Sequence, residues 1–185
     1  MTDAMKPSYH HGDLRSALLR SARMLLEEGG VGALKLRMIT RHAGVSATAA
    51  TPHFGNLAGL LSALAAEGFT ELADAMAPDR APEPHDVALA YVRFAVVNPG
   101  MFTLMFRSDA IDRQDTALQS ASEKAFNRLS NLVDAKQTED RVAVMVGLWG
   151  KVHGVAVLAI DGLLNGITPI QTLDELEYIL KCVFK

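Results

Sequence analysis

Residues 36–53 read LRMITRHAGVSATAATPH and contain two short apolar segments, 36–43 and 47–53, on either side of the turn Gly44-Val45-Ser46. Gly44 can adopt the left-handed backbone that a tight turn requires, and Ser46 is a favourable N-cap for a following helix. The pattern predicts a helix-turn-helix unit, whose second helix can enter the major groove of DNA. From these residues alone, an ordinary corner between two helices of an α-helical protein is an equally good interpretation.

Apolar residues at helical spacing continue on both sides of this segment, and no alternating run bounded by turn signals predicts a strand. Helices are expected to start at the caps Asp13 and Asn56, and the first of them should end at Gly29-Gly30. After a proline-rich loop at 77–85, further helices are expected over residues 87–97, 101–107, 118–132, 140–164 and 174–183. The expected fold class is therefore all-α.

The segment 140–164 differs from the others because apolar side chains cover almost every face of the expected helix. A helix that is apolar on every face must be buried on every face. In a chain of 185 residues, one face can pack within the domain and the other needs a partner. The segment therefore predicts a homodimer, with the helix at 174–183 completing the interface. A central core helix in a monomer is the alternative.

The composition is that of a globular protein, with 49% hydrophobic and 21% charged residues, and it excludes a disordered tail or a fibrous repeat. The single Cys182 excludes an internal disulfide and a Cys-rich metal site, which fits a reducing cytoplasm. Residues 1–57 carry seven Lys and Arg against four Asp and Glu, whereas residues 58–185 carry 11 against 17. This asymmetry favours a nucleic-acid surface at the N-terminal end.

Neither a signal peptide nor a membrane span is expected. The first twenty residues are polar, and the longest uncharged stretch, 42–66, contains two His, Pro52 and Asn56. A cytoplasmic location without a membrane partner is therefore predicted.

Four motifs, YHHGDLR at 9–15, LKLR at 34–37, AGVS at 43–46 and HF at 53–54, follow one another at a characteristic spacing. Together they resemble the N-terminal DNA-binding head of the tetracycline-repressor (TetR) family of bacterial regulators. NPGMFTLMF at 98–106, LWGKVHG at 148–154 and Asp161-Gly162 resemble the C-terminal domain of the subgroup with a Trp-His-Gly signature. The resemblance implies a DNA-binding domain over residues 1–56 and an effector-binding and dimerisation domain over 57–185.

What the resemblance implies in function is a homodimeric transcriptional regulator without a cofactor, with repression as its expected mode. Its two heads would bind a palindromic operator, and a small-molecule effector would change their separation until they no longer fit. Carried over by position, the DNA-binding residues are Arg37, Ser46, Thr48, Thr51 and His53. Arg37 is expected to meet a phosphate, and Thr48 and Thr51 are expected to read bases. Arg15 and Lys6 would add positive charge.

Several positions depart from the family pattern. Members usually have Tyr at position 51, Lys at 57 and a small hydroxyl residue at 35, whereas this chain has Thr51, Leu57 and Lys35. Pro52 also falls inside the expected recognition helix, where an interior proline costs about 3 kcal/mol unless the helix already ends there. Because phosphate contacts supply much of the affinity for DNA, an alternative arises. It is a TetR-fold protein that binds a small molecule or another regulator with an impaired head.

The larger domain gathers aromatic and thioether side chains with one imidazole, a lining that suits a small apolar or aromatic effector. The expected pocket residues are Phe94, Met101, Phe102, Met105, Phe106, Trp149 and His153. Plain core packing is the alternative for each residue, and the family resemblance is what favours a pocket. His153, one helical turn after Trp149, is expected to bond either an effector or a backbone carbonyl.

Catalytic and metal-binding motifs are not found: His-Glu-x-x-His, a Gly-rich phosphate loop, Gly-x-Ser-x-Gly and paired Cys do not occur. The adjacent His10 and His11 have no third metal ligand near them in the sequence. A non-enzymatic protein is therefore expected. The competing hypothesis, a small helical enzyme, rests only on the expected pocket and requires turnover of the ligand.

Overall fold

The computed structural model describes residues 11–77, 84–131, 140–167 and 172–184, and every regular element in these ranges is helical. The N-terminal helices are α1 (His11–Gly29), the 3₁₀ turn η1 (Val31–Ala33), α2 (Leu36–His42), η2 (Ala47–Ala50) and α3 (Thr51–Phe54). They are followed by α4 (Leu57–Ala75), α5 (Pro84–Val97), α6 (Pro99–Arg107), α7 (Thr116–Ser130), α8 (Arg141–Ile160), η3 (Leu163–Gly166) and α9 (Leu173–Val183). The predicted all-α fold class is confirmed.

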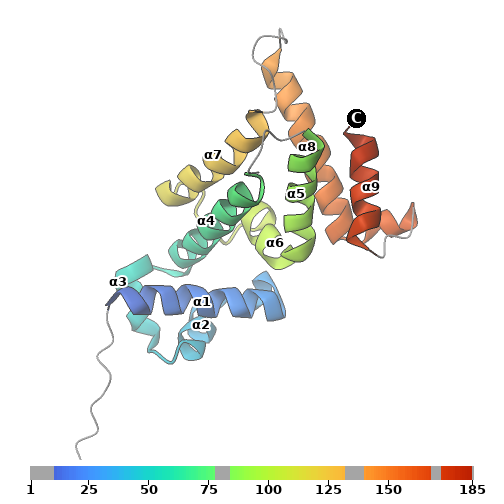
Figure 1. The fold of residues 1–185 in the computed structure, drawn as a ribbon. Coiled ribbons are helices and arrows are strands. Elements are labelled where there is room, and N and C mark those ends of the chain that lie inside the picture. Colours follow the sequence, from blue (N-terminus) through green and yellow to red (C-terminus); the bar gives the residue numbers. More distant parts are fainter. Residues whose placement is uncertain (1–10, 78–83, 132–139, 168–171, 185) are drawn as a thin grey trace, which may run out of the picture.

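The helices form a small head and a larger body (Figure 1). The head consists of α1, α2 and α3, and α4 leads away from it into the body. There α4 packs along α7, and α5 packs against α8 and α9. Helix α6 contacts α1, α4 and α5, so it lies where head and body meet. Both α4 and α6 thus belong to the body and also touch the head.

Side-chain caps explain where several helices begin. The side chain of Asn56 accepts a hydrogen bond of 3.0 Å from the backbone N–H of Gly59, as expected for the N-cap of α4. Asp115 and Asp140 cap α7 and α8 in the same way, and Thr172 forms a capping box with Glu175 at α9. The cap expected at Asp13 is wrong, because α1 already starts at His11. The predicted end of α1 at Gly29-Gly30 is confirmed.

The recognition segment is not one continuous helix. It consists of the 3₁₀ turn η2 and the single α-helical turn α3, and the chain then reverses at Gly55, whose φ is 71°. Pro52 lies in the first turn of α3, where its missing N–H has no carbonyl to bond within that helix. The cost of an interior proline therefore does not arise at Pro52.

One continuous apolar core extends from the head into the body. Leu18, Leu26 and Ile39 are buried in the head, and Leu64 and Phe102 are buried in the body. Because α4 contributes to both parts, the head is packed onto the body and is not joined to it by a loose linker.

Helix α8 is buried on one face only within this chain, as expected for residues 140–164, and it is not the fully buried core helix of the monomer alternative. Met145, Val152 and Ala156 are buried, whereas Val142 and Val146 are 73% and 63% exposed. It is also the one helix in the described ranges that is long and apolar enough to cross a membrane, although no span was expected there. The interface helix of a soluble oligomer has the same length and composition.

Candidate DNA-binding head and effector cavity

The outer surface of the head carries most of the residues expected to contact DNA. Arg37 on α2, Ser46 before η2, Thr48 on η2 and Thr51 on α3 are exposed. The hydroxyl oxygens of Ser46 and Thr48 lie 3.0 Å apart and share a hydrogen bond. These exposed side chains can therefore donate hydrogen bonds, and the hydroxyls can also accept them, as contacts with base edges and phosphates require.

His53 is less accessible than these four residues. It is partly buried, and the centroid of its ring lies 6.3 Å from that of Phe54. Inside the head, Ile39 and Ala50 are buried between α2 and η2, and Thr40 donates a 2.9 Å hydrogen bond to the carbonyl oxygen of Leu36. The interior of the head thus holds α2 and η2 together while the polar side chains point outward.

Arg15 and Leu57 have neighbours within the protein. The guanidinium carbon of Arg15 lies 5.3 Å from the centroid of the Phe54 ring, a cation–π contact that directs it to the corner between α3 and α4. Leu57 is partly buried against the apolar core. Lys6 and the rest of the N-terminal arm lie outside the described residues.

A cavity of about 510 Å³ opens in the body between α4, α5, α6, α7 and α8. Its walls are mainly aromatic and aliphatic, with charged and polar side chains contributed by α7 and by the loop before it. The lining residues are Phe69, Leu72, Tyr91, Phe106, Arg113, Ser122, Glu123, Ala125, Phe126, Asn127, Leu129 and Trp149. The size and the apolar lining suit a small organic ligand.

Of the seven residues expected to line the effector pocket, two line the cavity and five do not. Phe106 and Trp149 line the cavity, whereas Met101, Phe102 and Met105 are buried in the core of the body. Phe94 lines a separate surface groove with Arg93, Val97 and Asn98. His153 is not itself among the lining residues, but its ring stacks on Phe102 with centroids 5.2 Å apart.

Tyr91 is a cavity residue that the sequence did not point to. Its hydroxyl oxygen lies 2.9 Å from Nδ1 of His153, so a tyrosine of α5 and a histidine of α8 form a hydrogen bond next to Phe106. A phenol within the apolar stripe of residues 87–97 was the available signal, because a buried hydroxyl needs a polar partner.

The Tyr91–His153 pair is uncharged near neutral pH. Burial raises the pKa of Tyr91, and a hydrogen bond with Trp149 only partly opposes this. Burial, together with the positive charge of Arg107, lowers the pKa of His153. The tyrosine therefore keeps its proton and the imidazole stays neutral, which leaves this wall of the cavity polar without a charge.

Arg113 contributes a positive charge to the lining while it closes the end of α6. Its guanidinium donates hydrogen bonds to the carbonyl oxygens of Met105, Phe106 and Ser108 over 3.2 to 3.4 Å. Positive charge at a helix C-terminus is electrostatically favourable. Arg113 thus fixes the end of the helix that carries Phe106. Within the described ranges, no three His, Cys, Asp or Glu side chains gather to hold a metal ion.

Comparison with known families assigns both parts of the chain. Residues 85–182 match the family model described as the tetracyclin repressor-like C-terminal domain. Residues 18–64 match the model of the bacterial regulatory proteins of the tetR family. The chain belongs to the TetR family. This TetR-family protein therefore combines a regulator's helix-turn-helix head with a repressor-like helical body, as the sequence motifs predicted.

Individual relatives of this TetR-family protein agree with that assignment. The chain is 28% identical over 155 residues to the HTH-type transcriptional regulator BetI 2 of Chromohalobacter salexigens, covering 73% of this chain and 75% of the relative. A protein of unknown function from Rhodococcus sp. RHA1 shares 30% identity, with a TM-score of 0.76 and 97% of each chain covered. A TetR variant from Acinetobacter baumannii AYE, solved in complex with minocycline, has the same fold (TM-score 0.61, 18% identity, 96% and 95% covered).

Proposed function

We propose that this TetR-family regulator is a cytoplasmic repressor that binds a palindromic operator as a homodimer and is released by a small apolar or aromatic effector. The observation that carries the proposal is the aromatic cavity, whose walls include α4 and α6, the two body helices that also contact α1 of the head. A ligand in the cavity touches helices on which the head rests.

The proposed DNA contacts are Arg37, Ser46, Thr48, Thr51 and His53, in a DNA-binding domain that ends at residue 56. The exposure of four of these residues and the hydroxyl pair at Ser46 and Thr48 support the assignment. Arg37 would bind a phosphate, and the threonines would contact base edges.

The proposed effector site lies in the domain over residues 57–185, and Phe106 and Trp149 are its aromatic walls. Phe94, Met101, Phe102 and Met105 would act only by shaping the helices around it, and His153 would act through Tyr91. The aromatic lining favours an apolar or aromatic ligand, and the Acinetobacter protein of the same fold was solved in complex with minocycline. The subgroup with a Trp-His-Gly signature remains a prediction from residues 148–154.

The proposed homodimer would bury the exposed apolar face of α8. Val142, Val146 and Leu158 are exposed on this helix, and such a face is stabilised when a second copy covers it. This interpretation also accounts for the apolar composition of α8 without a membrane. No enzyme activity is proposed, because both family models describe regulators.

Release by the effector requires that the effector bind more tightly to the state that is not on DNA. A coupling free energy of about 1 to 3 kcal/mol would weaken operator binding several-fold to about a hundredfold.

Selection of bound fragments from a genomic DNA library, at moderate salt, tests the operator. Enrichment of one palindromic site is expected, and weak salt-sensitive binding to all fragments would contradict the proposal. Trp149, the single tryptophan of the chain, lines the cavity, so quenching of its fluorescence can then report which compounds enter it.

A second candidate function is a TetR-fold binding protein with an impaired head. It is favoured by Thr51 and by Leu57, which packs against the core and offers no cation to a phosphate. Combining Thr51→Tyr with Leu57→Lys would then raise DNA affinity strongly, because both anchors are restored. The salt dependence should steepen by about 0.9 per added phosphate contact. Leu57→Gln is the uncharged control, and equal binding by all variants would exclude this candidate.

A further inference from the structure

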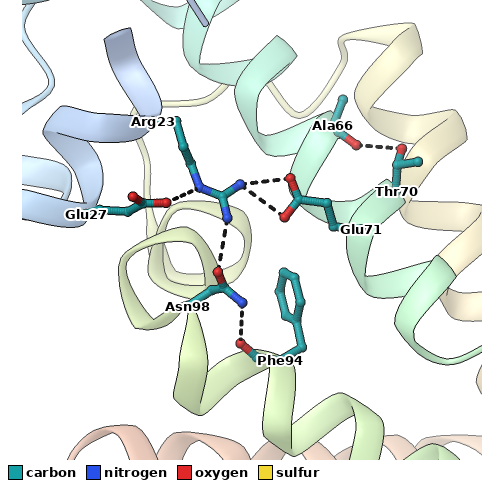
Figure 2. A network of polar contacts seen from close by, with 7 residues as sticks. All are labelled: Arg23, Glu27, Ala66, Thr70, Glu71, Phe94 and Asn98. Atoms are coloured by element: carbon teal, nitrogen blue, oxygen red, sulfur yellow. Dashed lines mark hydrogen bonds and ion pairs between the residues drawn. The ribbon is translucent and has the colours of Figure 1, made fainter. Parts of the chain in front are cut away.

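Arg23 of α1 forms hydrogen bonds with three side chains from three parts of the molecule (Figure 2). Its Nε donates to Glu27 one turn further along α1, at 2.7 Å. Its Nη1 donates to both carboxylate oxygens of Glu71 on α4, at 2.9 and 3.1 Å. Its Nη2 donates to Oδ1 of Asn98, between α5 and α6, at 3.0 Å. A single guanidinium thus bridges head and body at two points.

The two body partners of Arg23 lie on or next to helices that form walls of the cavity, although neither partner lines it. Glu71 lies on α4 between Phe69 and Leu72, both of which line the cavity. Asn98 directly precedes α6, which carries Phe106. The amide of Asn98 also donates a 3.1 Å hydrogen bond to the carbonyl oxygen of Phe94, which fixes its orientation. Any displacement of α4 relative to α6 changes the separation of Glu71 and Asn98.

Helix α6 also packs tightly against α1 of the head. A Cβ atom at Gly100, in the first turn of α6, would lie 2.9 Å from the carbonyl oxygen of Leu26 on α1. Helix α6 therefore rests on the backbone of α1 one turn away from Arg23. A movement at the Phe106 end of α6 cannot be absorbed by free space at its other end.

The electrostatics keep the guanidinium of Arg23 charged. The Arg23 side chain is only 21% exposed, and burial lowers its pKa. The hydrogen bonds and charges of Glu27 and Glu71 outweigh that effect, so the pKa of Arg23 is raised overall. The planar fork of donors fits a carboxylate at fixed angles, whereas a lysine ammonium would act as a point charge.

We propose that Arg23 is the positioning residue that sets the orientation of the DNA-binding head on the body, and that it transmits displacements of α4 and α6 around an occupied cavity to α1. This role rests on the proposed function of the head and the cavity. Glu71 and Asn98 are the two points at which Arg23 contacts the body. Glu27 only stiffens the side chain of Arg23 within the head.

The test is the distribution of distances between head and body, measured by pulsed electron spin resonance. Spin labels are attached at Arg41→Cys on α2 and Arg128→Cys on α7, both exposed positions, in a Cys182→Ser background. The labelled chain is diluted into excess unlabelled protein, so that distances within one chain are observed whatever the oligomeric state. The parent is expected to show one narrow distribution.

Two matched variants remove one carboxylate each from the same guanidinium. Glu71→Ala breaks the bridge to the body and is expected to broaden the distribution about twofold, because the head gains further orientations. Glu27→Ala removes a partner within α1 and should leave the width unchanged. Arg23→Lys keeps the charge but loses the fork, and it should behave like Glu71→Ala. It also serves as the second variant if Glu71→Ala folds poorly, which thermal unfolding will show.

The proposal is overturned if the distance distributions of Glu71→Ala and Arg23→Lys are as narrow as that of the parent. It is also overturned if Glu27→Ala broadens the distribution as much as they do. Affinity for the operator obtained from the genomic selection adds a functional readout. A loss of about tenfold is expected for Glu71→Ala but not for Glu27→Ala. A selection without any operator would refute the proposed repressor, whereas the distance measurement would still test the positioning role without DNA.

Discussion

At the scale of residues, the Tyr91–His153 contact shows how a polar pair is accommodated in an apolar wall. Tyr91 is buried and His153 is partly buried, and each supplies the hydrogen-bonding partner of the other at 2.9 Å. Phe102 stacks on the imidazole and Phe106 lies against its edge, which leaves little room for the ring to turn. Protonation of His153 would place a charge in this setting.

The stability of the protein should therefore depend on pH through His153. Burial lowers the pKa of the folded side chain, so as pH falls below about 6.5 the unfolded chain takes up the proton first. The free energy of unfolding should decrease over the range from about 6.5 down to the lower pKa of folded His153. Urea unfolding at several pH values should give a shallower pH dependence for His153→Gln. His42→Gln, at an exposed position of the head, is the control and should leave the slope unchanged.

Gly59 is a second residue whose identity is set by its surroundings. A Cβ atom there would overlap the carbonyl oxygen of Phe54, and a backbone atom cannot move aside as a side chain can. We expect Gly59→Ala to displace α3 and to lower the free energy of unfolding by about 3 kcal/mol, at the upper end for overpacking. Gly32→Ala, which adds a Cβ with no atom within 4 Å, should change it by less than about 0.5 kcal/mol. Similar urea midpoints for both variants would contradict this.

At the scale of elements, the recognition segment departs from the sequence pattern because a proline controls where a helix starts. The segment 47–53 has the composition of one short helix, but Pro52 cannot donate a hydrogen bond to the carbonyl of Thr48. The chain instead forms η2 up to Ala50 and begins α3 at Thr51. Helix α4 then starts independently at its own cap, Asn56.

Pro52→Ala distinguishes these two arrangements. If proline lies in the first turn of a helix, replacing it lowers the free energy of unfolding by at most about 1 kcal/mol, because the unfolded chain gains conformational freedom. Where proline interrupts a helix, the same replacement would stabilise the protein by about 3 kcal/mol. We expect a small decrease in the free energy of unfolding measured in urea. A large increase would show that η2 and α3 are one strained helix.

At the scale of the whole molecule, the exposed face of α8 is the feature that a single chain does not explain. Valines dominate this face. Helix α5 packs against α8, and α9 contacts α5 (Figure 1). A second copy that covers α8 would remove these side chains from water at about 25 cal/mol per Å² of apolar surface. It would also place two heads in one particle, as a palindromic operator requires.

Val146→Glu should therefore separate the proposed dimer, because a carboxylate would be buried in an apolar interface. Light scattering should change from the mass of two chains to the single-chain 19.9 kDa. Val97→Glu is the matched control, since Val97 on α5 is similarly exposed at 61% and lines a groove to which α8 contributes no residue. A parent protein that already has the mass of one chain would remove the argument for the interface.

Much of the fold could be predicted from the sequence because the signals that start and end helices are local. Asn56, Gly30 and the glycine turn at Gly44 act on their immediate neighbours, and the helices begin and end near them. Two expectations about helix ends were wrong: α1 starts before Asp13, and Pro52 divides the recognition segment into η2 and α3. The domain boundary at residue 56 remains a prediction.

The cavity was harder to predict because apolar spacing cannot distinguish a cavity wall from a packed core. Phe102 and Phe106 stand one turn apart on α6 with the same chemistry, yet one is fully buried and the other lines the cavity. Tyr91 and Arg113 reach it from segments that carry no motif. Which face of a helix meets empty space depends on how neighbouring helices cross.

The sequence by itself indicated that the chain is helical, that two short helices joined by a tight turn lie near the N-terminus and that residues 140–164 need apolar surroundings. These properties follow from the spacing of apolar residues, from helix caps and from composition, and each of these signals lies within a short stretch of sequence. The packing of the helices was needed to show that α8 keeps one face exposed, that Tyr91 meets His153 and that Arg23 joins α1 to Glu71 and Asn98. Such contacts join residues 48 to 75 positions apart, and their geometry depends on the angles at which helices pack.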